Sequence, residues 1–107
     1  MGYDYEELRS DAAQLAARFE NAELFSIGES VMEHKIYCIK IGSGKRKLFV
    51  NGAHHGLEYL TSAFIMKFLF EYAECIQSGR EFFGYDAKAL SDRTSLWAVP
   101  MVNPDGV

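Results

Sequence analysis

The stretch that most constrains the fold is an apolar run followed by a glycine-rich loop and a long apolar segment. Residues 46–51 (RKLFVN) predict a strand whose contiguous apolar positions indicate burial on both faces, and hence a central place in a sheet. Residues 57–77 predict a helix, because the polar positions recur at helical spacing in one narrow stripe. A helix of this composition is expected to be mostly buried. This strand–loop–helix unit is typical of α/β folds.

Sequence patterns on either side of this unit predict the remaining helix and strands. Asp4 and Glu7 form a capping-box pair at the start of an amphipathic helix over residues 3–20. Apolar alternation and flanking turn residues predict three more strands, at residues 23–28, 34–41 and 95–102. Residues 80–94 are expected to form a loop with one short helical turn. The order predicts an α/β fold with a partial mixed sheet of about four strands and flanking helices.

Length and charge exclude several classes of function. The chain has 107 residues, enough for one small domain with a core, and a formal net charge of −4. Its basic residues are scattered apart from residues 45–47 (KRK), so no basic face for nucleic acid is predicted. Residues 57–76 are the most apolar segment, but ionisable side chains, among them Glu58 and Lys67, lie within it. These charges argue against a membrane span.

The cysteines and the amino terminus bear on the cellular compartment. Cys38 lies in a predicted strand and Cys75 in the predicted long helix. Two cysteines without a spacing pattern indicate buried small side chains rather than a disulfide or a metal site. The amino-terminal residues lack the basic and apolar regions of a signal peptide. This pattern favours a cytoplasmic location, with secretion left open if a leader has been removed.

The loop after the strand carries the candidate metal ligands. His55 and Glu58 are three residues apart at a strand-to-helix turn, where both side chains can converge on one point. A neutral imidazole and a carboxylate both suit zinc. Gly52 and Gly56 let the backbone turn sharply around that point. The spacing alone is a weak signal, so a plain structural α/β domain with a polar, metal-free loop stays open as an alternative.

Four short motifs follow one another along the chain. They are Tyr5-Glu6-Glu7-Leu8 opening a helix, Ser26-Ile27-Gly28-Glu29-Ser30 leading into a strand, His55-Gly56-Leu57-Glu58 after Asn51-Gly52, and Asn103-Pro104-Asp105-Gly106. Their order and spacing resemble the amino-terminal part of the zinc carboxypeptidase family, the metallopeptidases of the carboxypeptidase A type. The resemblance is closest to bacterial γ-D-glutamyl-diamino-acid peptidase-like members. It implies that residues 1–107 form an amino-terminal fragment of a catalytic domain, the first half of the zinc carboxypeptidase fold.

The resemblance implies that His55 and Glu58 are the first two ligands of a Zn²⁺ ion. In the family a third ligand, a histidine, and a general-base glutamate follow the Asn-Pro-Asp-Gly motif, as do the residues that hold the substrate. The fragment alone is therefore expected to be inactive, and to bind zinc weakly if at all. His34 matches no family ligand and stands in a Glu-His-Lys triplet where the family usually has Gly-Arg. His54 is expected to play a supporting or structural role beside the site.

The function implied by the resemblance is that of a zinc-dependent metallopeptidase. Its substrates would be peptides, cleaved near the C-terminus or in bacterial cell walls, with the metal polarising the carbonyl and activating water. A non-catalytic binding module that reuses the fold is the alternative. Without the second half of the fold, the edge of the strand at residues 47–50 and one flank of the next helix are exposed. The fragment is therefore expected to self-associate through that strand edge.

Overall fold

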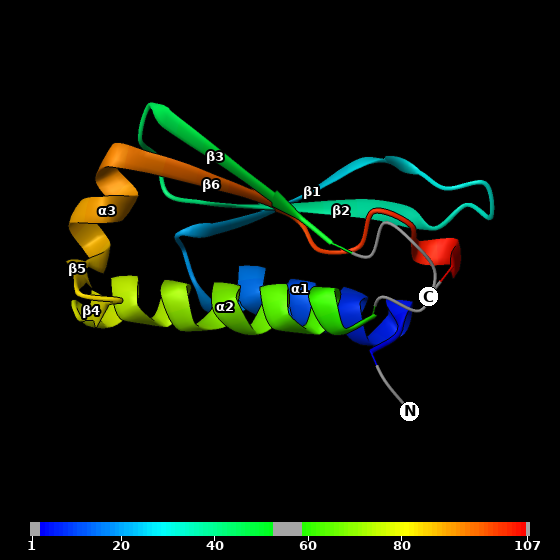
Figure 1. Ribbon diagram of the computed structural model, residues 1–107, viewed down its shortest axis with the longest axis horizontal. Coiled ribbons are helices and arrows are strands. Elements are labelled where there is room, and N and C mark those ends of the chain that lie inside the picture. Colours follow the sequence, from blue (N-terminus) through cyan, green and yellow to red (C-terminus); the bar gives the residue numbers. More distant parts are fainter. Residues whose placement is uncertain (1–2, 53–58, 107) are drawn as a thin grey trace.

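The computed structural model describes residues 3–52 and 59–106, which form a sheet laid over helices (Figure 1). The helices are α1 (Tyr5–Arg18), α2 (Tyr59–Ser78), α3 (Ala87–Arg93) and the 3-10 turn η1 (Pro104–Gly106). The strands are β1 (Ala22–Glu29), β2 (Lys35–Ile41), β3 (Arg46–Asn51), β4 (Glu81–Phe82), β5 (Tyr85–Asp86) and β6 (Thr94–Val99). The predicted succession of helix, three strands, long helix and strand is confirmed, and with it the α/β class.

The main sheet is mixed and has four strands in the order β1–β2–β6–β3. β1 pairs antiparallel with β2, and β2 with β6, whereas β3 runs parallel to β6. Two parallel neighbours require a crossover connection, and α2 and α3 provide it. The expectation of a partial mixed sheet with flanking helices is therefore confirmed.

Helix α1 begins where the sequence predicts. The Asp4 carboxylate accepts a hydrogen bond from the Glu7 amide at 2.8 Å, and the Glu7 carboxylate accepts one from the Asp4 amide at 3.4 Å. This reciprocal pair satisfies two amides that have no partner within the helix. The apolar stripe of α1 turns toward the sheet, and Leu8 and Leu15 are buried. The capping box is confirmed, and the helix is two residues shorter at each end than predicted.

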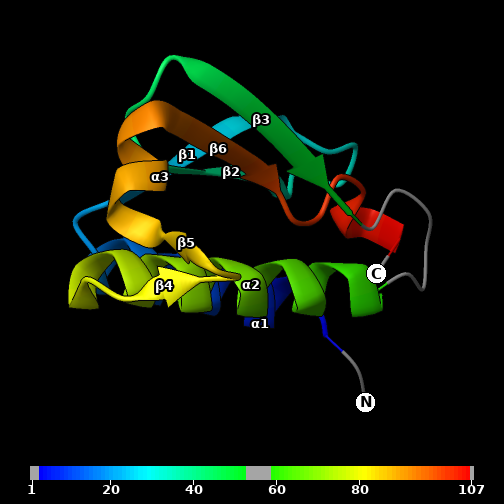
Figure 2. The same cartoon turned by 60° about the vertical axis from the view of Figure 1, so that its left-hand side comes forward.

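The core lies between the sheet and helices α1 and α2, which lie on the same side of the sheet (Figures 1 and 2). The most deeply buried side chains come from both layers: Leu8, Leu15 and Phe19 from the α1 region, Met66 and Leu69 from α2, and Ile39, Ile41 and Ala98 from the strands. Phe19 meets Phe70 of α2 edge to face, with ring centroids 6.4 Å apart. The molecule is therefore built of two layers around one apolar core.

Two expectations about burial are wrong. Among the described residues, β3 is an edge strand rather than a central one, because β6 takes the place between β2 and β3. All six of its residues are exposed. The exposed edge at residues 47–50 is as expected for this part of the fold. Helix α2 is less buried than expected, because the apolar residues Leu60 and Phe64, outside its polar stripe, are 70% and 73% exposed. The contiguous apolar run of β3 reflects a surface that the described part of the chain leaves uncovered.

A small hairpin between α2 and α3 was not predicted. β4 and β5 pair antiparallel over two residues each, at Glu81–Phe82 and Tyr85–Asp86. The two turn residues, Phe83 and Gly84, both have positive φ values of 53° and 82°, as in a type I′ turn. Phe82 packs against Phe68 of α2 with ring centroids 5.1 Å apart. Strands of two residues are too short to show a detectable alternation of apolar and polar residues. For this reason the sequence predicts a loop with one helical turn over residues 80–94.

The two cysteines occupy the positions of small apolar side chains. Cys38 is buried in β2, Cys75 is half-buried in α2, and both thiols are free. Burial raises the pKa of the Cys38 thiol, which keeps it protonated at neutral pH. The expectation of two unpaired cysteines is confirmed. Over residues 3–52 and 59–106, no helix is long and apolar enough to cross a membrane.

Candidate functional site

The candidate metal loop joins the carboxyl end of β3 to the start of α2 (Figure 1). His54, His55 and Glu58 fall within residues 53–58, which lie outside the described residues. The structure therefore does not place the predicted ligands themselves. It does describe both ends of the loop, Gly52 on one side and the first turns of α2 on the other.

Gly52 fixes the strand end of the loop. Its amide donates to the Val99 carbonyl at 3.1 Å, and its carbonyl accepts from the Val102 amide at 2.9 Å. A Cβ atom at position 52 would lie 2.9 Å from both the Ile65 Cδ1 and the Thr61 Oγ1 atoms of α2. The absence of a side chain therefore lets the end of β3 press closely against the helix.

Ser62 fixes the helix end of the loop. Its side chain is fully buried, and its hydroxyl donates to the Pro100 carbonyl at 2.5 Å. Pro100 directly follows the last residue of β6, so its lack of an amide hydrogen removes no hydrogen bond from the strand. Both ends of the loop are thus fastened to residues 99–102. This is the carboxyl end of the parallel pair β3–β6, where α/β sheets usually bind ligands.

Apart from the loop, a cluster of polar side chains links the Asn-Pro-Asp-Gly turn to the β1–β2 connection by hydrogen bonds. The Asp105 carboxylate accepts hydrogen bonds from the Ser30 hydroxyl at 2.6 Å and from the Met32 amide at 3.0 Å. The Nδ1 atom of His34 lies 2.9 Å from the same carboxylate. The His34 ring also stacks on Tyr5, with centroids 4.4 Å apart. These contacts join α1, the β1–β2 connection and η1 into one unit.

The environment of Asp105 favours its ionised form. The hydrogen bond from Ser30 is the largest cause that lowers the pKa of this carboxyl below its ordinary value, and the Met32 amide and His34 act in the same direction. Partial burial opposes them, since the side chain is 17% exposed. The sequence gives no sign of this cluster, because Asp105 is more than 70 residues away from Ser30 and from His34 along the chain. His34 has a structural role here, and no role as a metal ligand was predicted for it.

The hydrogen bonds to Asp105 predict a pH-dependent contribution to stability. Because the pKa of Asp105 is lower in the folded chain than its ordinary value of 3.8, the contribution is fully present above that value. It is lost as the pH falls through the folded pKa. In Asp105→Asn this titration is removed. Urea unfolding should therefore show a gap between wild type and variant that is constant from neutral pH to about pH 5 and shrinks below about pH 4.

A matched control for this prediction is Asp92→Asn. Asp92 is 56% exposed and pairs with Lys88 one helical turn away, so its replacement should alter stability little. A gap for Asp105→Asn that stays the same from neutral to acidic pH would contradict the prediction.

The donor types at the loop fit zinc. An imidazole and a carboxylate are both common zinc ligands, and the two described ends of the loop lie at the carboxyl end of the parallel strands. Among residues 3–52 and 59–106, no group of three or more histidine, cysteine, aspartate or glutamate side chains is arranged to hold a metal.

Comparisons with known proteins identify the family of the chain. The family profile described as "Zinc carboxypeptidase" matches residues 8–107. The γ-D-glutamyl-L-diamino acid endopeptidase 1 of Lysinibacillus sphaericus is 33% identical over 105 residues, covering 98% of this chain and 26% of that protein. The uncharacterized protein YqgT of Bacillus subtilis is 31% identical over 107 residues, covering 98% of this chain and 28% of its own length.

Solved structures show the same fold. Thrombin-activatable fibrinolysis inhibitor superposes with a TM-score of 0.84 at 21% identity, covering 99% of this chain and 26% of that one. A putative carboxypeptidase from Burkholderia mallei gives a TM-score of 0.80 at 21% identity, with 98% and 27% covered. The chain thus spans about a quarter of the length of the curated relatives it matches. Because the family profile covers nearly all of its residues, the chain belongs to the zinc carboxypeptidase family.

Proposed function

We propose that this chain is the part of a zinc-dependent metallopeptidase that contributes the zinc ligands His55 and Glu58. The observation that carries the proposal is the fastening of both loop ends to residues 99–102, through Gly52 and Ser62. In the sequence, the His-x-x-Glu motif stands between these two anchored ends, which lie at the carboxyl end of a parallel strand pair. The matching family profile is described as "Zinc carboxypeptidase".

The two ligands have separate roles in this proposal. His55 offers a neutral ring nitrogen and Glu58 a carboxylate oxygen, and His54 supports the site from outside the ligand set. When bound, zinc supplies a Lewis acid that polarises a carbonyl and lowers the pKa of water. A catalytic zinc site has three protein ligands, so residues 1–107 alone are expected to bind zinc weakly and to lack peptidase activity.

The substrate class proposed here is taken from the name of one curated relative. At 33% identity, the relative named a γ-D-glutamyl-L-diamino acid endopeptidase supports a peptidase acting on bacterial cell-wall peptides that contain γ-D-glutamyl bonds. Cleavage of ordinary peptide C-termini is the second candidate activity, supported by the description of the matching family profile as "Zinc carboxypeptidase". Both are hydrolyses of a peptide bond, and both use the same zinc ligands.

Zinc titration tests the ligand assignment without requiring activity. Direct titration of the wild-type chain with zinc ions, followed by calorimetry at high protein concentration, should give a weak but measurable affinity. His55→Ala and Glu58→Gln should each weaken zinc binding by at least about tenfold, since even outer partners of a metal site are worth that much. The matched control is His34→Ala, which removes an imidazole held at Asp105 and should leave zinc affinity unchanged.

Two results would contradict the assignment. Zinc affinity that is unchanged in His55→Ala would remove this residue from the ligand set. A wild-type chain that binds zinc no better than the His55→Ala and Glu58→Gln double variant would contradict the assignment of both ligands.

A further inference from the structure

The zinc proposal gives no role to Asn51, the last residue of β3. An asparagine followed by a glycine is a chemically labile position in a polypeptide, because glycine has no side chain to hinder attack by its own nitrogen. Asn21 instead precedes an alanine, and Asn103 precedes a proline, whose nitrogen carries no proton to lose. The sequence therefore singles out Asn51 as the asparagine most prone to lose its side-chain amide.

Loss of this amide proceeds through the main chain. The Gly52 nitrogen gives up its proton and attacks the Cγ atom of Asn51, so that a C–N bond forms and the bond from Cγ to the side-chain nitrogen breaks. The side-chain nitrogen takes up a proton and leaves as ammonia, and a succinimide ring remains. Water then opens the ring at one or the other of its carbonyl carbons, which gives aspartate or isoaspartate. Nothing is oxidised or reduced, and water is the only co-reactant.

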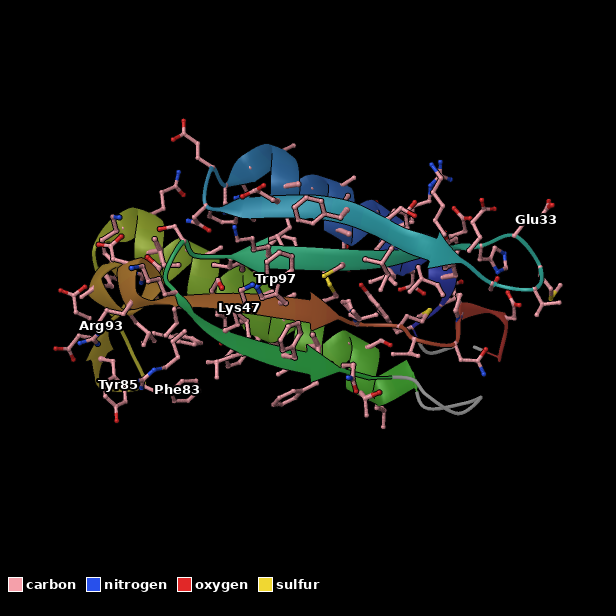
Figure 3. All side chains as sticks on the ribbon, turned by 90° about the horizontal axis from the view of Figure 1, so that it is seen from above. Glu33, Lys47, Phe83, Tyr85, Arg93 and Trp97 are labelled. Carbon is pink, nitrogen blue, oxygen red and sulfur yellow. The ribbon has the colours of Figure 1, made fainter. Side chains whose placement is uncertain are left out.

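The folded chain holds the attacking nitrogen in place. The Gly52 amide donates to the Val99 carbonyl at 3.1 Å, and the Gly52 carbonyl accepts from the Val102 amide at 2.9 Å. The first of these bonds continues the parallel pairing of β3 with β6, which run side by side when seen from above (Figure 3). Both backbone groups of Gly52 are thus engaged, and the bond to Val99 must break before the nitrogen can lose its proton.

Packing restricts the same residue. Gly52 is buried, and a Cβ atom at this position would lie 2.9 Å from both the Ile65 Cδ1 and the Thr61 Oγ1 atoms of α2. Close packing of this kind leaves little room for the peptide unit between residues 51 and 52 to rotate. The nitrogen is therefore hindered from turning toward the Asn51 side chain as well as from losing its proton.

We propose that Asn51 is a deamidation site of this chain, and that the anchoring of Gly52 to residues 99–102 determines when it reacts. While both hydrogen bonds of Gly52 are made, the reaction is suppressed. When the end of β3 separates from β6, the nitrogen is released and the site reacts as it does in an unfolded chain. Local opening of this kind occurs in native proteins at a lower free energy than global unfolding. The proposal requires no metal and is independent of the proposed function.

The reaction changes the anchor permanently. Aspartate at position 51 adds a negative charge at the end of β3. Isoaspartate routes the main chain through the former side chain and so lengthens it by one methylene group directly before Gly52. Because Gly52 lies in close contact with α2, this extra length cannot be accommodated while both of its hydrogen bonds are kept. Deamidation therefore converts a transient opening at the strand end of the candidate metal loop into a lasting one.

Incubation of the wild-type chain with and without urea tests this gating. Trypsin cleaves after lysine and arginine, so each asparagine falls in a separate peptide, with Asn51 in residues 48–67. Mass spectrometry of these peptides over time, in mildly alkaline buffer, gives the rate of deamidation at each site. In urea, Asn51 should react faster than Asn21 and Asn103. In the folded chain it should react at least about tenfold more slowly than in urea, because two hydrogen bonds of Gly52 oppose the reaction.

Val102→Pro tests the anchor itself. Proline lacks the amide that donates to the Gly52 carbonyl, whereas the matched control Val102→Ala keeps it. Near-UV circular dichroism of Trp97 checks that each variant is folded. In the folded state, Val102→Pro should deamidate at Asn51 at least about threefold faster than Val102→Ala, which corresponds to the loss of one hydrogen bond. In urea the two variants should react at the same rate.

A second variant keeps the test decisive if Val102→Pro does not fold. Ser62→Ala removes the hydroxyl that donates to the Pro100 carbonyl in the same segment, and it should likewise react faster than wild type when folded. An Asn51 that reacts no faster than Asn21 in urea would overturn the proposal. Equal rates in the folded and the unfolded wild-type chain would also overturn it, as would a folded anchor variant that reacts no faster than its reference chain.

Discussion

Gly44→Ala is expected to lower the free energy of unfolding by about 3 kcal/mol, near the upper end of the usual cost of overpacking. Gly44 lies in the turn before β3, against the junction of α3 and β6. A Cβ atom there would be 1.8 Å from the Arg93 carbonyl carbon and 2.0 Å from the Thr94 amide nitrogen. Both are backbone atoms, so relief requires β6 to move away from β3.

The displacement would also disturb the hydrogen bond from the Gly44 amide to the Thr94 carbonyl, which is 3.0 Å long. Since β6 is the central strand that joins β2 to β3, a shift at its start affects both pairings. Urea unfolding followed by far-UV circular dichroism measures the loss. The substitution acts at the start of β6, at the opposite end of the strand from the candidate metal loop. A loss of stability in this variant is therefore expected to leave the candidate site unaffected.

The matched control is Gly28→Ala. Gly28 also lies in an extended segment, but no heavy atom comes within 4 Å of a Cβ atom built there. Its replacement should change the free energy of unfolding by no more than about 0.5 kcal/mol. Equal effects at the two positions would show that the backbone contact at Gly44 is relieved without cost.

Local signals made most of the fold predictable. The Asp4–Glu7 capping box and the apolar stripe of α1 are set by residues three and four apart, and the structure confirms both. The mixed sheet followed from the order of the elements, since short connections produce antiparallel pairs and a helical crossover produces a parallel one. Each of these inferences depends on neighbouring residues in the sequence.

The sequence-based predictions failed where the structure depends on contacts between residues that are far apart in the sequence. The apolar run of β3 predicts burial but does not distinguish a central strand from an edge awaiting a partner, and the position of β6 settles the question. The contact between His34 and Asp105 joins residues 71 positions apart, so no local sequence pattern predicts it. Strands as short as β4 and β5 have no detectable period.

The candidate site was predictable in its chemistry rather than in its geometry. The types and spacing of His55 and Glu58 indicate zinc, while these residues lie outside the described part of the chain. The anchoring contacts of Gly52 and Ser62 were not predicted. A glycine before a helix and a serine within it have many roles, and the choice among them depends on contacts with residues 99–102.

Leu69→Ala is expected to lower the free energy of unfolding by about 2–5 kcal/mol, the range observed for truncating a fully buried leucine. Leu69 lies near the middle of α2 with 0% of its side chain exposed, in the core between the helices and the sheet. Removing its outer carbons leaves a cavity that the fixed strands of the sheet can fill only in part. Leu60→Ala, on the same helix but 70% exposed, is the control and should cost no more than about 0.5 kcal/mol.

The comparison between these two leucines also separates the core from the open edge. Both substitutions remove the same atoms from one helix and leave helix propensity nearly unchanged, so the difference in unfolding free energy reports burial alone. Measured by urea unfolding at a low protein concentration, where self-association does not contribute, the difference should exceed about 1.5 kcal/mol. A smaller difference would mean that α2 packs less tightly at Leu69 than its zero exposure indicates, or that Leu60 is covered in solution. Repeating the pair at high concentration distinguishes these cases, because only a covered Leu60 changes its cost with concentration.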